Sequence, residues 1–177
     1  MNKIVSILIL TFFVFSCSSD LDFDQTENVS IQPVIVSNLA AFEIQANEFV
    51  SGGIEETQFE DVPNFDLFAD SFFKNNLTKI EFLFEINNTI NRDFVVDLVL
   101  LDEVDSPLYT VTIPVPAYSG VEKLVLKTEV FETNLAVLTS TRKMSFTIRL
   151  QPGTLLTETS PGSLKLRSNV TGYFKIE

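Results

Sequence analysis

The 177-residue chain has no histidine, no tryptophan and a single cysteine, Cys17. The lack of histidine excludes a Ser-His-Asp triad and any imidazole-ligated metal site. A single cysteine excludes a disulfide within the chain and a thiolate metal cluster. No glycine-rich phosphate loop is present either. What remains is carboxylate chemistry, for which two acids must lie roughly 5 to 10 Å apart in a cleft. We therefore expect no catalytic residue and no enzymatic activity, with a carboxylate-dependent hydrolase as a remote alternative.

Lysine and arginine are also scarce, with 12 against 24 acidic residues and a net charge of −12. The imbalance is confined to the first part of the chain: twelve carboxylates and no cationic side chain lie between Cys17 and Phe73, whereas residues 74–177 are close to neutral. Such a field repels phosphate backbones, so we expect no nucleic acid partner. We expect these acidic residues to keep the protein soluble. The alternative is that they bind a divalent cation or a cationic partner.

The first seventeen residues have the organisation of an export signal. Lys3 precedes an apolar run from Ile4 to Phe15, and Ser16 and Cys17 follow. This pattern is typical of a secretory signal peptide covering residues 1–16, which is removed from the mature protein. The run of about 12 apolar residues is shorter than the roughly 20 that a membrane-spanning helix needs.

The segment Val14-Phe15-Ser16-Cys17 resembles the lipobox of bacterial lipoproteins, with an aliphatic residue three positions before the cysteine and a small residue just before it. The resemblance implies cleavage between Ser16 and Cys17, a diacylglycerol on the Cys17 sulfur and acylation of the new amino terminus. Two or more acyl chains hold a protein stably on a membrane. This covalent lipid is the only cofactor that we expect. The alternative is a secreted protein with a free Cys17.

Residues 17–30 are predicted to be the lipidated cysteine and a flexible acidic tether, because the segment is polar and shows no periodicity. The tether resembles the acidic segment that directs some Gram-negative lipoproteins to the outer face of the outer membrane. We therefore expect an outer-membrane, lipid-anchored, surface-exposed protein with an envelope or extracellular protein as partner. Residues 31–177 are long enough for one domain.

Alternation of apolar and polar residues recurs along this domain, which predicts half-buried strands. The fold class expected is all-β: an antiparallel β-sandwich of immunoglobulin-like or Greek-key style, with eight to ten strands and one or two short helical caps. The expected segments are residues 29–36, 40–47, 54–60, 79–86, 94–101, 108–115, 121–128, 144–150 and 164–176. Short connections predict that the four from 79 to 128 form an antiparallel meander. A bend or bulge is expected near Ser168 and Gly172, two small residues on the apolar side of the last strand.

One segment, residues 64–75, has helical rather than strand periodicity. Phe65, Phe68 and Phe72 recur at steps of three and four after Pro63, which predicts a short amphipathic helix that closes one end of a sheet. The alternative is an exposed patch of these three residues, with Phe73, that binds a partner. A second helical crossing is expected over Phe131, Leu135 and Leu138, whose spacing is similar.

Three groups of residues bear on ligand binding. Asp102, Glu103 and Asp105 crowd one turn and are weak candidates for a calcium site, although a charged hairpin tip explains them equally well. Asp97 lies in a strand that is otherwise apolar, which predicts an ion pair with Arg92, Arg149 or Lys127. With only three tyrosines and no tryptophan, aromatic platforms for sugars are few. We expect a non-enzymatic interaction or structural module, and the alternative is a module that binds glycan or calcium.

Overall fold

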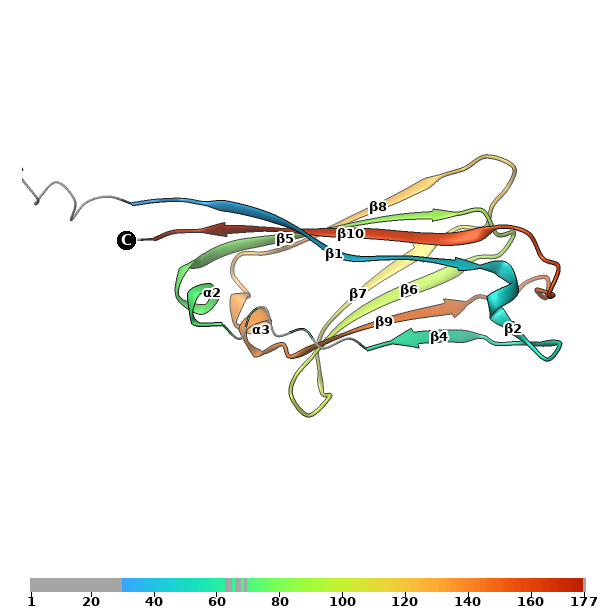
Figure 1. The fold of residues 1–177 in the computed structure, drawn as a ribbon, viewed down its shortest axis with the longest axis horizontal. Coiled ribbons are helices and arrows are strands. Elements are labelled where there is room, and N and C mark those ends of the chain that lie inside the picture. Colours follow the sequence, from blue (N-terminus) through green and yellow to red (C-terminus); the bar gives the residue numbers. More distant parts are fainter. Residues whose placement is uncertain (1–29, 63–64, 66–67, 69, 177) are drawn as a thin grey trace, which may run out of the picture. The chain divides into compact units, whose positions relative to one another are not determined.

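A computed structural model describes residues 30–62, 65, 68 and 70–176 (Figure 1). Residues 31–176 form one compact unit. The predicted signal peptide, the lipobox and all of the predicted tether except Ser30 lie outside the described residues. Within the described part of the chain, no helix has the length and apolar character needed to cross a membrane.

The secondary structure is dominated by strands. The elements are β1 (Val34–Gln45), the 3-10 turn η2 (Ala46–Phe49), β2 (Val50–Ser51), β3 (Ile54–Glu55), β4 (Gln58–Asp61), α2 (Ser71–Asn76), β5 (Leu77–Asn88), β6 (Phe94–Leu101), β7 (Pro107–Val115), β8 (Leu124–Phe131), α3 (Leu135–Ser140), β9 (Lys143–Leu150) and β10 (Ser163–Phe174). The two segments expected at 29–36 and 40–47 are a single long strand, β1.

Eight of these strands form two four-stranded antiparallel sheets. Sheet I has the order β1-β10-β5-β8 and sheet II the order β4-β9-β6-β7, while β2 and β3 pair separately. Among the eight, the first pairs with the last, the second with the seventh, the third with the sixth and the fourth with the fifth. This nested pairing is that of a jelly roll, which contains two Greek keys. The predicted antiparallel β-sandwich is confirmed, and its strand order is that of a jelly roll rather than an immunoglobulin domain.

The predicted four-strand meander is wrong. Only β6 and β7 form a hairpin, because β5 and β8 belong to sheet I while β6 and β7 belong to sheet II. The chain crosses between sheets after β5 and again after β7, as Figure 1 shows. Stacked sheets lie about 10 Å apart, and a five-residue connection spans that distance as easily as it closes a hairpin. Loop length therefore did not distinguish the two arrangements.

The core lies between the sheets and follows the alternation seen in the sequence. In β5, every second residue from Ile80 to Ile86 is buried, and in β10 Leu164, Leu166 and Val170 are buried with them. Strand β6 is fully buried on its core face, and on its outer face Asp97 is buried while Val95, Val99 and Leu101 are half-buried. The bulge that was expected in the last strand lies instead in its neighbour β1, opposite Ser168. There β1 bulges between Asn38 and Ala40, and the Ser168 hydroxyl binds both the Ala40 amide and the Ala40 carbonyl, at 3.0 and 3.1 Å.

Both helices contact β5, and in Figure 1 they lie at the left-hand end of the sandwich. Helix α2 is shorter than the predicted segment 64–75, and it begins after Asp70, whose carboxylate accepts a hydrogen bond from the Phe72 amide at 2.7 Å. Helix α3 buries Leu138 completely.

A buried arginine joins three connections that lie far apart in the sequence. Arg92, 5% exposed, pairs with Glu55 of β3 at 3.0 Å and donates to the carbonyls of Gln151 and Thr154 in the β9–β10 loop. The second Glu55 oxygen accepts a hydrogen bond from the Leu156 amide at 2.7 Å. Because both side chains of the pair are almost fully covered, removing either partner would leave an unpaired buried charge.

Candidate functional site

The outer face of sheet I carries the most varied set of polar side chains, arranged in rows across the strands. One row runs from Glu43 through Lys165 and Asn87 to Leu124, and the next runs from Ala41 through Arg167 and Glu85 to Leu126. These residues share a face because the side chains of a strand alternate and the register brings outward positions opposite one another. Each row therefore places a cation from β10 beside a polar or acidic side chain from β5.

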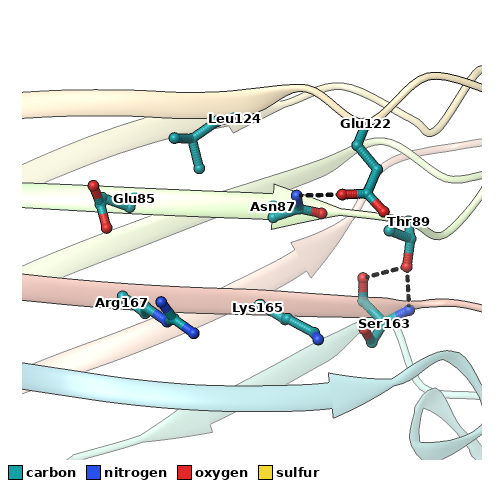
Figure 2. Close-up of a pocket in the computed structure, with 8 residues that line it drawn as sticks. All are labelled: Glu85, Asn87, Thr89, Glu122, Leu124, Ser163, Lys165 and Arg167. Atoms are coloured by element: carbon teal, nitrogen blue, oxygen red, sulfur yellow. Dashed lines mark hydrogen bonds between the residues drawn. The ribbon is translucent and has the colours of Figure 1, made fainter.

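These rows form the floor of a groove of about 490 Å³ at one end of the sheet. We call it the outer groove. Figure 2 shows its lining, which consists of Glu85, Asn87, Thr89, Glu122, Leu124, Ser163, Lys165 and Arg167. Strands β5 and β10 supply the floor, and Glu122 approaches from the loop between β7 and β8. The groove is thus mainly polar, with one apolar side chain, Leu124, at its margin.

Hydrogen bonds fix two sides of the outer groove. The Asn87 amide donates to Glu122 at 3.2 Å, which holds the loop residue over the end of β5. The Thr89 hydroxyl accepts from the Ser163 amide at 2.8 Å and donates to the Ser163 carbonyl at 3.1 Å. Both pairs are drawn in Figure 2. Their polar atoms are therefore already held in place on the free chain.

Two charged side chains of the groove, Arg167 and Glu85, are not held by hydrogen bonds of this kind within the described chain. Arg167 and Glu85 are direct register partners on β10 and β5, yet among the described residues neither has an ion pair or a side-chain hydrogen bond. Lys165 differs, since it pairs with Glu43 on the far side at 3.3 Å. The groove therefore offers one unpaired guanidinium and one unpaired carboxylate to a polar ligand, next to the amide of Asn87.

At the opposite end of the same face, Lys79, Glu81 and Tyr173 form a cluster in which the polar groups contact one another. Lys79 pairs with Glu81 at 2.6 Å and lies 4.5 Å from the centre of the Tyr173 ring, and the Tyr173 hydroxyl donates to Glu81 at 3.1 Å. The hydrogen bond from Lys79 holds the pKa of Glu81 below its usual value, and the same bond raises the pKa of Lys79. The charges here satisfy one another, which leaves the outer groove as the open polar site of this face.

The buried carboxylate of Asp97 has the structural role that the sequence predicts. Asp97 is 7% exposed, it pairs with Arg149, and it accepts a hydrogen bond from the Thr112 hydroxyl at 2.7 Å. Of the three cations predicted as partners, Arg149 is the one found. Arg92 pairs with Glu55 instead, and Lys127 pairs with Glu129 at 3.1 Å.

The predicted calcium candidates do not converge on a common point. One oxygen of Asp102 accepts hydrogen bonds from the amides of Val104 and Ser106, at 2.9 and 2.8 Å, and so closes the β6–β7 turn. Asp105 pairs with Lys143 at 2.6 Å. In the part of the chain that the structure describes, no three acidic, histidine or cysteine side chains form a group that could hold a metal ion. Asp102, Glu103 and Asp105 therefore have the geometry of a charged hairpin tip.

The proposed partner patch of Phe65, Phe68 and Phe72 is not an exposed surface. Phe68 is fully buried, with its ring 6.4 Å from Phe82 in the core. Phe65 and Phe73 are half-buried against Phe68, at 5.3 and 6.0 Å, and only Phe72 is classed as exposed, at 37%. The alternative of an exposed docking patch is therefore corrected: Phe68, which precedes α2, is part of the core, and Phe65 and Phe73 pack against it.

The three tyrosines lie on different elements, so they do not form an aromatic platform. Tyr109 is on β7 of sheet II, Tyr118 is in the β7–β8 loop and Tyr173 is on β10 of sheet I. The Tyr109 hydroxyl donates to Glu129 at 2.5 Å, and this hydrogen bond raises the pKa of Tyr109.

No protein-family model matches the chain, and no curated protein matches it. Solved structures that it resembles include the VP2 subviral particle of infectious bursal disease virus, with 14% identity and a TM-score of 0.43 over 81% of this chain and 37% of that one. A protein of Parabacteroides distasonis ATCC 8503 has 13% identity and a TM-score of 0.43, over 65% of this chain and 38% of the other.

A third structure is the enzymatically active domain of tailspike protein 4 of bacteriophage CBA120, with 9% identity and a TM-score of 0.38 over 84% of this chain and 20% of the tailspike chain. The chain therefore spans well under half the length of the structures that it resembles. At TM-scores below 0.5, none of these resemblances bears on what the chain does.

Proposed function

We propose that the chain is a lipoprotein of the bacterial cell envelope, anchored to the outer membrane through an acylated Cys17, whose β-sandwich is a non-enzymatic interaction or structural module. The observation that carries the proposal is the segment Val14-Phe15-Ser16-Cys17 at the end of an apolar run. The acidic residues that follow it act as a spacer and direct the domain to the outer face of the membrane. The partner is an envelope or extracellular protein.

The geometry supports a role without catalysis. The most deeply buried carboxylates in the described part of the chain, Glu55 and Asp97, are both held by arginines and further hydrogen bonds. Their oxygens are therefore occupied by contacts within the fold. The carboxylates of the outer groove, Glu85 and Glu122, lie on an open face rather than in a water-excluding cleft.

Protease treatment of intact cells tests the anchor and the orientation together. We expect the native chain to fractionate with the outer membrane, to incorporate labelled palmitate and to be cleaved by protease added to whole cells. Cys17→Ala removes the sulfur that carries the lipid, so this variant should be released in soluble form without label. Ser18→Ala is the matched control, because it changes the neighbouring residue and keeps the cysteine.

Two outcomes would contradict parts of the proposal. If Cys17→Ala stays membrane-bound, the lipid anchor is wrong. If the native chain is protected until the outer membrane is opened, the anchor stands and the outward orientation is wrong. A variant with Asp20, Asp22 and Asp24 neutralised tests the orientation separately from the anchor. If the acidic spacer directs the domain outward, this variant should remain anchored but be protected from protease added to whole cells.

A second candidate function, glycan binding, is favoured by the unpaired Arg167 and Glu85 beside Asn87 in the outer groove. A sugar hydroxyl both donates and accepts hydrogen bonds, so a guanidinium and a carboxylate in adjacent positions suit it. Titration of the purified full chain with a panel of neutral oligosaccharides tests this function. Arg167→Ala and Glu85→Ala should each weaken binding at least tenfold, whereas Asn169→Ala, outside the groove on the same face, should not. Binding that is indifferent to both groove variants would exclude this site.

Calcium binding is tested by thermal unfolding with added calcium or with a chelator. A ligand that binds only the folded state raises the midpoint by mass action. Because Asp102 and Asp105 are engaged elsewhere, we expect an unchanged midpoint. A rise that is abolished by Glu103→Gln would restore the calcium alternative.

A further inference from the structure

Strand β8 is an edge of sheet I, and it exposes an unusual row of apolar side chains. It pairs with β5 on one side only, and no other strand of the described chain lies along its second side. On its outer face Leu124, Leu126 and Val130 are 56%, 60% and 50% exposed. An edge strand with free backbone groups and an apolar face is a template for pairing with another strand. In Figure 1, β8 runs along the margin of the sandwich.

The core-facing side of the same strand carries a charge of each sign. Lys127 and Glu129 lie opposite Phe84 and Phe82 of β5, so they face inward at the margin of the core, and they form an ion pair at 3.1 Å. An inward-pointing charge on an edge strand normally discourages pairing with a further strand, although here Lys127 and Glu129 already pair within the strand and Glu129 also accepts a hydrogen bond from the Tyr109 hydroxyl. A strand that supplies the complementary charges at the correct spacing removes that obstacle.

A second copy of β8 supplies them. We propose that two copies of this chain associate edge to edge through β8, antiparallel, about a two-fold axis at Thr128. In this register Lys127 of each copy lies opposite Glu129 of the other, and Leu126 lies opposite Val130. An antiparallel pair related by such an axis keeps each face continuous. Sheet I of one copy and sheet I of the other therefore join into one sheet of eight strands. Thr128 lies opposite Thr128, a pairing that contributes a cross-strand hydrogen bond.

The register is specific because the strand is self-complementary at one position only. Moving the axis by one residue to either side, to Lys127 or Glu129, places like charges directly opposite each other, which is destabilising. The same charges turn away a foreign strand that lacks their order. The contact is a single strand long, so the association is weak and depends on concentration.

Disulfide trapping in the purified full chain tests this register. In the proposed dimer, Thr128→Cys places the two new sulfurs on directly opposite residues, within the Cα separation of roughly 4.4 to 6.8 Å that a disulfide requires. Leu126→Cys is the matched control on the same strand, because its two copies are about 14 Å apart along the paired strands. The unmodified chain controls for cross-linking through Cys17.

We expect mild oxidation to convert most of the Thr128→Cys chain to a covalent dimer and to leave Leu126→Cys at the level of the unmodified chain. A mixture of Leu126→Cys with Val130→Cys should cross-link, since these positions are opposite one another. If neither Thr128→Cys nor the mixture exceeds Leu126→Cys alone, the proposal is overturned.

Charge exchange in the Thr128→Cys background gives a second test. Adding Lys127→Glu creates two like-charged pairs per dimer, so the rate of cross-linking should fall roughly tenfold. Adding Glu129→Lys to that variant restores opposite charges at both pairs and should restore the rate. A far-ultraviolet circular dichroism spectrum that is unchanged shows that each variant is folded. If the double exchange does not recover the rate while the protein remains folded, complementarity of these two residues is not what holds the copies together.

Discussion

At the level of single residues, the buried pair of Arg92 and Glu55 links the β5–β6 connection to β3 and to the β9–β10 loop. The guanidinium bonds to a carboxylate and two backbone carbonyls from segments that share no strand pairing with its own loop. A pair of this kind adds little net free energy relative to a well-packed apolar pair, but it is costly to break on one side only. Its structural effect is to fix the β9–β10 loop against the β5–β6 connection.

Arg92→Met should lower the free energy of unfolding by about 3 to 5 kcal/mol, because Glu55 is left buried without a cation. Urea unfolding measures the loss. Lys143→Met is the control, since it breaks a comparable pair with Asp105 that is largely exposed and should cost less than about 1 kcal/mol. Equal losses in the two variants would show that burial of the Arg92 pair is not what makes it matter.

The hydrogen bond from Tyr109 to Glu129 makes a pH-dependent contribution to stability. Because the bond raises the pKa of Tyr109 in the folded chain, the neutral phenol is favoured by folding. Its contribution is therefore complete below the unfolded tyrosine pKa of about 10 and is lost as the pH rises through the folded value. The stability difference between the native chain and Tyr109→Phe, measured by urea unfolding from pH 8 to 11.5, should shrink above pH 10. A difference that is constant or grows over this range would contradict the assignment.

At the scale of single elements, the segment around α2 separates two roles for its phenylalanines. Phe68 fills the open end of the core, whereas Phe72 is partly exposed and rests on Phe174, 5.2 Å between ring centres. Phe68→Ala should therefore cost about 3 to 5 kcal/mol, and Phe72→Ala much less. Thermal or urea unfolding of the two variants provides the comparison. If Phe72→Ala were the more damaging, the plug would be wrongly assigned.

The strands themselves were predictable because alternation is a local signal. The alternation predicts the buried face of β5 whatever strand lies beside it, and this face consists of Ile80, Phe82, Phe84 and Ile86. The choice of neighbour is not local: β5 pairs with β10, nearly eighty residues later, and not with β6, which follows it directly. Nothing in the sequence of either strand encodes that pairing by itself, which is why the meander was predicted instead of the jelly roll.

The same limit applies to the candidate site. The alternation of apolar and polar residues places Lys165 and Arg167 on the polar face of β10, and Glu85 on that of β5. That Arg167 lies opposite Glu85 follows from the register of β10 on β5, and the position of Glu122 depends on the β7–β8 loop. The outer groove arises from strand pairing between distant segments, so the sequence alone did not identify it as a site.

At the scale of the whole molecule, β10 lies between β1 and β5 and joins them into one sheet. A chain that ends at residue 162 lacks β10, so β1 loses the strand that connects it to the sandwich. We expect this truncation to abolish the cooperative urea transition. A chain that ends at residue 174 keeps all of β10 and should retain the transition at a similar midpoint. Cooperative unfolding of the shorter chain would contradict the central role of β10.

The pairing of the first long strand with the last has a consequence in time. During synthesis, β1 emerges early and has to wait for more than a hundred further residues before its partner exists, because Ile44 pairs with Leu164 and Val34 with Tyr173. Contacts of such long sequence separation form slowly. Sheet I can therefore close only after β10 has been made, so the pairing of β1 is delayed relative to its synthesis. If the chain is exported unfolded, as the proposed signal peptide would require, this delay is an advantage that follows from the strand order alone.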